Sequence, residues 1–186
     1  MLRGRIVAAN GVKAEELKPT PQAAWALQSD RGITYSNEIP AGSRLVEGEW
    51  WPADYQGPPL LSMEKRIAEG LGLKIGDSLT VNVLGRNITA RIANLRVVDW
   101  QSLGINFVLV YSPNAFRGAP HTHIATLTFT GDTTAQQDAA ILRDMAAAFP
   151  AVTTVRVKDA IQAVGSVVGN LILGIRGASL ITLIAA

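Results

Sequence analysis

The 186-residue sequence contains no cysteine, which excludes a disulfide scaffold, thiolate zinc sites and cysteine nucleophiles. It is also poor in charge, because only 17% of its residues are charged and the net charge is +2. The basic residues are scattered and mostly alternate with acidic ones, so no Lys/Arg cluster could follow a phosphate backbone. We therefore expect no nucleic-acid partner. What the chain does have is apolar residues, at 48%, which is ample for a folded core.

The end of the chain almost lacks charge, since Arg176 is the one charged residue after Asp159. Residues 177–186 (GASLITLIAA) supply about half of the roughly 20 apolar residues that a transmembrane helix needs. The beginning has no secretory signal, because the apolar run at 6–9 is shorter than the about 7–15 residues that such a signal requires. We predict a fragment cut inside a transmembrane helix, with an upstream membrane helix placing the domain outside the cytoplasm. The alternative is a C-terminal helix buried on its own domain.

Residues 31–112 have the alternation and turn signals of a small β-module. Leu79, Val81 and Val83 alternate with polar residues ahead of a glycine turn, which predicts a hairpin with one solvated face. A possible N-cap at Ser62, followed by an apolar face, predicts a helix over 62–71. Together these patterns predict a mostly antiparallel module with one helix, and its expected strands are 33–36, 44–46, 79–83, 88–92 and 105–111. Residues 3–9 are expected to form a further strand, which ends at the Asn10-Gly11 turn signal.

The next segment predicts a β-α-β unit. Residues 124–129 and 152–157 are the expected strands. Between them, Thr133 and Thr134 cap a helix that Pro150 stops.

The last segment has apolar residues at alternating spacings of three and four, which is typical of a helix that faces another helix. Gly165 and Gly169 add a small-xxx-small pair that lets a neighbouring backbone approach closely. We predict a stalk helix running into the membrane, although packing of the same seam on its own domain is the alternative. The seam residues are Ile161, Val164, Val168, Leu171 and Ile175.

No pattern in the sequence predicts catalysis. His121 and His123 are spaced for one side of a strand, but zinc needs three or four ligands and no third lies nearby, so we expect no metal. Ser112 could join His121 and Asp132 in a triad, yet no nucleophile elbow precedes any serine. We expect no catalytic residue and no cofactor, and we retain a hydrolase using Asp54, Asp99 or His121 only as an alternative to test.

Several short blocks occur in an order that resembles a known family. They lie at residues 2–7, 48–55, 72–77, 98–107, 119–122 and 155–160. The most specific are the tryptophan block (GEWWPADY), the aspartate-tryptophan block (VDWQSLGINF) and the Arg-Val-Lys-Asp block (VRVKDA), in that order. The chain resembles part of the extracytoplasmic domain of ABC transporter permeases of the FtsX/MacB type, in the YbbP-like subgroup. The motif residues, for which the resemblance implies a structural or interaction role, are Trp50, Trp51, Pro52, Asp54, Tyr55, Asp99, Trp100, Asn106, Phe107, Arg156, Lys158 and Asp159.

The resemblance implies an α+β fold, in which a β-rich lobe with one helix is inserted into a β-α-β membrane-proximal portion. The corresponding segments are the lobe at 1–120, the membrane-proximal portion at 121–158, and a stalk helix with the start of a membrane span at 159–186. It also implies a periplasmic domain of an inner-membrane permease that couples ATP-driven movement to export or extraction of a hydrophobic or lipid-like substrate. Its implied partners are a separate cytoplasmic ATPase, a second permease half or subunit, and the membrane. The alternative function is a soluble ligand-binding β-module with no role in transport.

Overall fold

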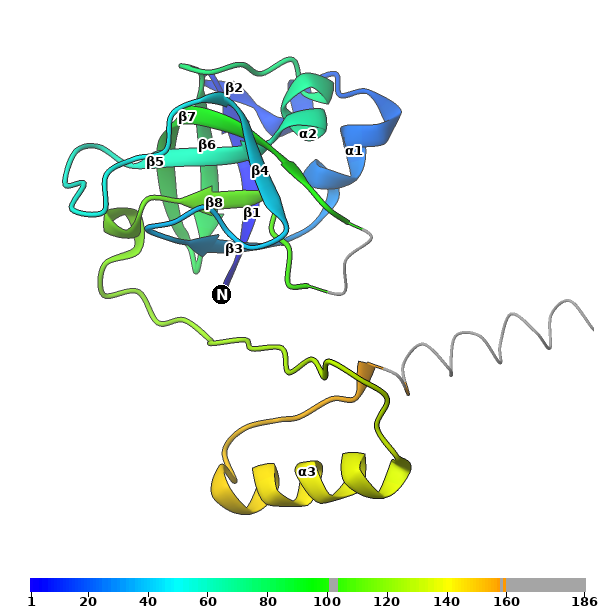
Figure 1. Cartoon of the computed structure of the whole chain (residues 1–186). Coiled ribbons are helices and arrows are strands. Elements are labelled where there is room, and N and C mark those ends of the chain that lie inside the picture. The colour runs from blue at the N-terminus through cyan, green and yellow to red at the C-terminus, as the bar shows by residue number, and fades with distance from the viewer. Residues whose placement is uncertain (101–103, 158, 160–186) are drawn as a thin grey trace, which may run out of the picture. The chain divides into compact units, whose positions relative to one another are not determined.

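The computed structural model describes residues 1–100, 104–157 and 159, and it divides the chain into two compact units, residues 1–127 and 128–186. The first unit is mostly β (Figure 1). Its strands are β1 (Leu2–Ala9), β2 (Val12–Lys13), β3 (Arg31–Tyr35), β4 (Ser43–Gly48), β5 (Leu60–Glu64), β6 (Ser78–Val83), β7 (Arg86–Val98) and β8 (Leu109–Tyr111). Its helices are α1 (Pro21–Gln28) and α2 (Lys65–Gly70), with short 3₁₀ turns η1 (Ala14–Glu16) and η2 (Pro113–Phe116).

Six of these strands close into a barrel. Strand β1 pairs antiparallel with β3 and β6, β3 pairs parallel with β8, and β8 pairs antiparallel with β5. Strand β5 then pairs parallel with β7, and β7 pairs antiparallel with β6, which completes the ring. Closure leaves these six strands without free edges. Strand β2 extends β1, and β4 pairs antiparallel with the last part of the long β7.

The barrel interior is filled by the apolar residues that alternate along its strands. In β6, Leu79, Val81 and Val83 are buried while the residues between them are partly exposed. Strand β5 is buried along its whole length, because it lies between β7 and β8 and is covered on both faces. The barrel's main apolar cluster also includes Ile6, Ile33, Met63, Ile92 and Leu109.

Two tight turns set the register of the hairpins. Asn10 and Gly11 have φ of 49° and 78° between β1 and β2, and Leu84 and Gly85 have φ of 50° and 83° between β6 and β7. Consecutive residues with positive φ form the two-residue turns that match the twist of antiparallel strands. The hairpin predicted around residue 85 and the turn predicted at Asn10-Gly11 are therefore confirmed.

Helices α1 and α2 lie beside each other against the barrel (Figure 1). A Cβ placed on Gly70 of α2 would lie 2.5 Å from the Cβ of Ala23 in α1, so this glycine permits the close approach. The backbone NH of Thr20 donates to the carbonyl of Gly70 at 2.8 Å and joins the start of α1 to the end of α2. Their small buried residues, which include Ala23, Ala26 and Ala68, close part of the core.

A pair of backbone hydrogen bonds joins the start of the barrel unit to the segment after η2. The backbone NH of Thr122 donates to the carbonyl of Met1 at 3.0 Å, and the amino group of Met1 donates to the carbonyl of Thr122. Residues 1 and 122 therefore lie side by side, although they are 121 positions apart in sequence.

The second unit contains helix α3 (Ala135–Ala148). Thr134 caps it, because its side chain accepts from the backbone NH of Gln137 while the Gln137 side chain accepts from the Thr134 NH. This confirms the predicted helix and its threonine cap. All residues of α3 are exposed or partly exposed.

The predicted α+β fold class is wrong. The structure is a mostly β domain built on a closed six-stranded barrel, with α1, α2 and α3 as the α-helices of the described residues. Residues 124–129 and 152–157, expected as the strands of a β-α-β unit, form no strand, because no neighbouring segment in the described chain pairs with them. No helix in the part of the chain described here combines the length and apolarity needed to cross a bilayer.

The helix predicted over 62–71 is also wrong at its first three residues. Residues 60–64 form the buried strand β5, and α2 begins only at Lys65. Its N-cap is Glu64, whose carboxylate accepts from the backbone NH of Ile67 at 2.8 Å. The predicted stalk helix beyond Asp159, with its seam residues 161, 164, 168, 171 and 175, lies outside the described residues.

Candidate binding groove

The tryptophan block leaves β4 through a glycine that no other residue could replace without strain. Gly48 has φ of +76°, and a Cβ at this position would lie 2.4 Å from the carbonyl oxygen of Ala93. The side chain of Asn94 on β7 donates to the carbonyl of Glu49 at 3.0 Å. The block is therefore fixed to β7 before its aromatic residues begin.

Trp50 and Trp51 fasten the loop after β4 to the segment after β3. Their rings stack with centroids 4.2 Å apart. The indole NH of Trp50 donates to the carbonyl of Asn37 at 2.8 Å, and that of Trp51 donates to the carbonyl of Ser36 at 2.9 Å. With both indole NH groups used and Trp51 buried, the pair acts as a packed corner of the fold.

The aromatic residues of two predicted blocks meet in one small apolar cluster outside the main core. Its buried members are Trp51, Leu60 and Val110, with Trp50, Tyr55, Ala93 and Phe107 packed against them. The tryptophan block and the aspartate-tryptophan block are thus brought together through Phe107. Tyr55 continues the loop by donating its hydroxyl to the carbonyl of Pro58 at 2.8 Å.

The end of η2 and the residues after it lie against the end of β3. The ring of Phe116 contacts Tyr35 on β3, with centroids 6.3 Å apart, and Tyr35 in turn lies edge-on to His121 at 5.6 Å. The hydroxyl of Tyr35 and Nε2 of His121 are 3.3 Å apart. Because Nδ1 of His121 lies 3.0 Å from the carbonyl of Ala119, it donates there, which leaves Nε2 as the acceptor of the Tyr35 hydroxyl in neutral His121.

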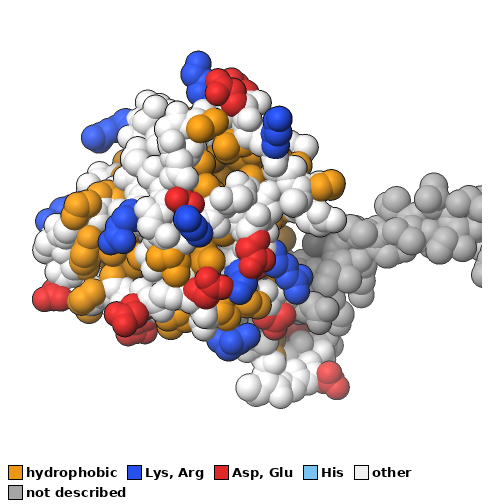
Figure 2. All heavy atoms as spheres, turned by 90° about the horizontal axis from the view of Figure 1, so that it is seen from above, with side chains coloured by type: hydrophobic (Ala, Val, Ile, Leu, Met, Phe, Trp, Pro, Cys, Tyr) orange, Lys and Arg blue, Asp and Glu red, His pale blue; other side chains and the backbone are white. Residues whose placement is uncertain are grey.

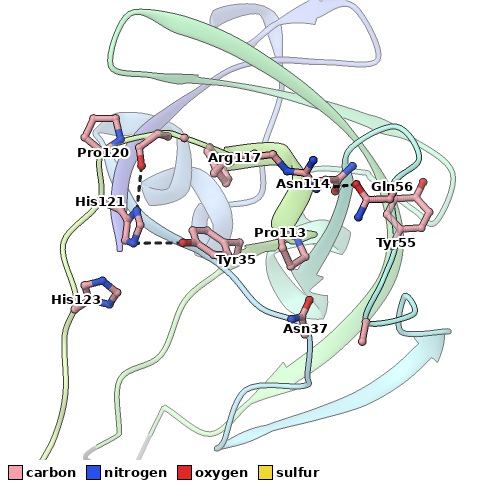
Figure 3. Close-up of a pocket in the computed structure, with 14 residues that line it drawn as sticks. Tyr35, Asn37, Tyr55, Gln56, Pro113, Asn114, Arg117, Pro120, His121 and His123 are labelled. Carbon is pink, nitrogen blue, oxygen red and sulfur yellow. Dashed lines mark hydrogen bonds between the residues drawn. The ribbon is translucent and has the colours of Figure 1, made fainter.

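Tyr35, the tryptophan-block loop and the segment after η2 together enclose a groove of about 610 Å³ (Figure 3). In the figure His121 and His123 lie at one end, Tyr55 and Gln56 lie at the other, and Tyr35 and Arg117 lie between them. The volume is within the range of about 300–1,000 Å³ usual for small-molecule sites. The lining residues are Tyr35, Asn37, Ala53, Tyr55, Gln56, Pro113, Asn114, Phe116, Arg117, Gly118, Ala119, Pro120, His121 and His123.

The groove carries basic and amide groups but no carboxylate among its lining residues. Arg117 donates to the amide oxygen of Gln56 at 2.7 Å, and within the described chain no acidic side chain forms an ion pair with it. Figure 2 shows acidic and basic side chains interspersed on the face that it presents. The lining of the groove, by contrast, contains Arg117 and no acidic residue.

The structure places the two histidines side by side, but they do not belong to a metal site in the described residues. The rings of His121 and His123 lie with centroids 4.8 Å apart, and both line the groove. No group of three or more His, Cys, Asp or Glu side chains in the described residues could hold a metal ion. Ser112, considered as a nucleophile, is fully buried and its hydroxyl accepts from the backbone NH of Leu60 at 3.0 Å. Its hydroxyl is thus committed to the fold.

The other residues of the motif blocks take up varied positions. Pro52 and Asp54 are exposed in the loop after the tryptophan pair. Trp100 is 49% exposed, while Asn106 donates to the carbonyl of Asp99 at 2.9 Å and links the two ends of the segment between β7 and β8.

In the second unit, Arg156 forms ion pairs with Asp138 on α3 at 2.9 Å and with Asp159 at 3.5 Å. These contacts hold the segment after α3 to the helix. Lys158 lies outside the described residues.

Sequence reasoning missed two buried charged residues on adjacent strands of the barrel, Glu64 and Arg96. Glu64 on β5 and Arg96 on β7 are opposite each other in register, and both are buried. Arg96 donates to the carbonyls of Phe107 and Val108, the latter at 3.0 Å, and Nη1 lies 3.3 Å from the hydroxyl of Ser43. Burial lowers the pKa of Arg96 to about 10, and the Glu64 carboxylate opposes that shift, so Arg96 stays charged at neutral pH.

The sequence does contain a signal for these two buried charges. Arg96 interrupts the apolar run that includes Leu95 and Val97, and Glu64 ends the run that begins at Leu60. Charges inside apolar strands are buried only when they are paired. By contrast Tyr35, Asn114 and Arg117 belong to no motif, and no pattern of spacing indicates that they share a groove.

Comparison with known proteins gives one informative match. No protein-family model and no solved structure matches the chain. The "Uncharacterized ABC transporter permease YbbP" of Escherichia coli (strain K12) is 29% identical over 127 residues. The alignment covers 68% of this chain but only 15% of the relative, so the chain corresponds to a small part of that protein's length. The similarity therefore supports an ABC transporter permease-like region in this chain.

Proposed function

We propose that this chain is an extracytoplasmic domain of an ABC transporter permease of the FtsX/MacB type, located on the periplasmic side of a bacterial inner membrane. The observation that carries the proposal is the similarity to YbbP over 127 residues. In this role the domain takes part in ATP-driven export or extraction of a hydrophobic or lipid-like substrate. A separate cytoplasmic ATPase hydrolyses the ATP, a second permease half or subunit completes the transporter, and this chain itself is not an enzyme.

The barrel unit has features that suit a binding or mechanical domain. Its groove is lined by aromatic, amide and basic side chains, which can bind a ligand but supply no acid–base pair of carboxylates. The backbone pairing of residues 1 and 122 ties the start of β1 to the segment after η2 within the barrel unit.

The side of the membrane can be tested with a cysteine at the tip of the β6–β7 hairpin. Leu84 is 68% exposed there, and this chain contributes no native cysteine that could react. Leu84→Cys in the full-length protein should be labelled by a membrane-impermeant maleimide in intact cells whose outer membrane has been permeabilised. Val81→Cys in the same hairpin is the matched control, because Val81 is fully buried and should react only after denaturation.

Labelling of Leu84→Cys only after the inner membrane is lysed would contradict the proposed location. The transport role needs a second measurement, namely purification of the tagged full-length protein with its membrane partners. Recovery of an ABC-type ATPase in stoichiometric amount is the expected result. A protein that purifies from the soluble fraction without such an ATPase would favour the alternative of a soluble ligand-binding β-module, for which the groove is the supporting observation.

A further inference from the structure

The groove beside Tyr35 combines a cation that has no acidic partner in the described chain with partly exposed aromatic side chains. Arg117 is exposed, and its recorded partner is the neutral amide of Gln56. The rings of Tyr35 and Tyr55 are half-buried, so each keeps some surface available to a ligand. None of the lining residues is acidic. An anion entering the groove would therefore meet no repulsion from a carboxylate in its lining.

The hydrogen-bonding groups of the groove divide into those already used and those still available. His121 uses both ring nitrogens, toward Ala119 and Tyr35, and so acts as part of the wall. The guanidinium of Arg117 has five NH donors in a planar fork and spends one on Gln56. That fork matches the oxygens of a phosphate group and binds it through two parallel hydrogen bonds.

We propose that this groove binds a phosphate ester, with its phosphate oxygens on Arg117 and its carbon portion against the rings of Tyr35 and Tyr55. The volume of about 610 Å³ accommodates a ligand of this size. The absence of carboxylates from the lining favours an anion over a cation, and the rings favour an ester over inorganic phosphate. This inference does not depend on the proposed transport function, because it rests on side chains of the barrel unit alone.

The first test uses the full 186-residue chain, labelled with ¹⁵N and titrated with phenyl phosphate. Saturable shifts are expected at the backbone amides of Arg117, Gly118 and His121. Arg117→Gln should weaken binding by about tenfold, because a charge-assisted fork is replaced by a neutral amide. Arg117→Lys should keep part of the affinity, because it retains the charge without the fork. Arg86→Gln is the matched control, because it removes an exposed arginine at the β6–β7 turn, outside the groove. It lowers the net charge by the same amount and should leave binding unchanged.

Equal binding by wild type and Arg117→Gln would overturn the proposal, and so would an equal loss in Arg86→Gln. A second arm identifies the source of the phosphate. Vesicles of phosphatidylcholine with and without phosphatidylglycerol are sedimented with the chain. Retention that requires phosphatidylglycerol and is lost in Arg117→Gln indicates a lipid headgroup, whereas binding of phenyl phosphate without such retention indicates a soluble ester. If the chain sediments with the vesicles equally well in wild type and Arg117→Gln, and phenyl phosphate does not bind, then neither a lipid headgroup nor a soluble ester binds at Arg117 and the proposal is refuted. These readouts are separate from the maleimide labelling, so either proposal can fail alone.

Discussion

Replacement of Arg96 by methionine is expected to destabilise the barrel strongly. The guanidinium is fully buried and holds the carbonyls of Phe107 and Val108, while Glu64 lies opposite it on β5. In Arg96→Met those carbonyls lose their donor, and the positive charge that interacts with the buried Glu64 is removed. Each buried acceptor left without its donor costs about 1–3 kcal/mol of unfolding free energy. We therefore expect a loss of about 2–6 kcal/mol, a large part of the about 5–15 kcal/mol typical of a domain.

The assay is urea unfolding of the full chain followed by tryptophan fluorescence, since all four tryptophans lie in the barrel unit. Arg91→Met, on the same strand but exposed, is the matched control and should change stability by no more than about 0.5 kcal/mol. Adding Glu64→Gln to Arg96→Met should recover about 1 kcal/mol or more, because the orphaned charge is removed while an oxygen remains to cap α2. The reasoning is refuted if Arg96→Met costs no more than Arg91→Met, or if adding Glu64→Gln makes the protein less stable still.

Two further predictions concern single positions in the barrel unit. Gly48→Ala should lose about 2–4 kcal/mol of unfolding free energy, because the new Cβ meets a carbonyl at 2.4 Å as well as an unfavourable positive φ. Gly11→Ala, with φ of +78° and open space, should lose only about 1–2 kcal/mol in the same urea assay, and equal losses would contradict the steric argument. Burial raises the pKa of Tyr111, whose hydroxyl has no hydrogen-bond partner in the described chain. The unfolded state therefore loses this proton first, above about pH 10, and stability falls as pH rises. At neutral pH, Tyr111→Phe should be as stable as wild type or up to about 1 kcal/mol more stable. Thermal melts above pH 10 should show a smaller loss of stability in the variant than in wild type. A variant that melts at a lower temperature at neutral pH would show that the hydroxyl is hydrogen-bonded.

The hairpins could be predicted because their signals are local. Alternating residues in β6 and a turn at Leu84-Gly85 specify both strands without reference to the rest of the chain. Strand β5 could not, because residues 60–64 are buried on both faces and so show no alternation. A short apolar run of this kind looks the same in a buried strand and in a helix. The parallel pairing with β7 that decides the matter is a long-range contact.

The residues expected to form a β-α-β unit illustrate a different limit. The cap at Thr134 and the helix that follows it are local features and are present. A strand, however, exists only with a partner, and residues 124–129 and 152–157 have a strand-like composition without one in the described chain. Composition gives the tendency to extend, whereas pairing is decided by segments distant in sequence.

The sequence does not predict the candidate groove. The tryptophan block and the two histidines were both identified from the sequence, but nothing in their spacing indicates that Tyr55 and His121 line one cavity. Arg117 is a single basic residue in a loop and has no motif around it. What assembles the groove is the closed barrel, which brings the end of β3 beside the segment after β8.

The backbone rung between Met1 and Thr122 has a mechanical consequence. Tension applied between residues 1 and 122 would be carried first by this pair of hydrogen bonds and not by those between the barrel strands. The hydrogen bonds between the barrel strands would then carry little of the load, so the barrel and its groove would move as one rigid body.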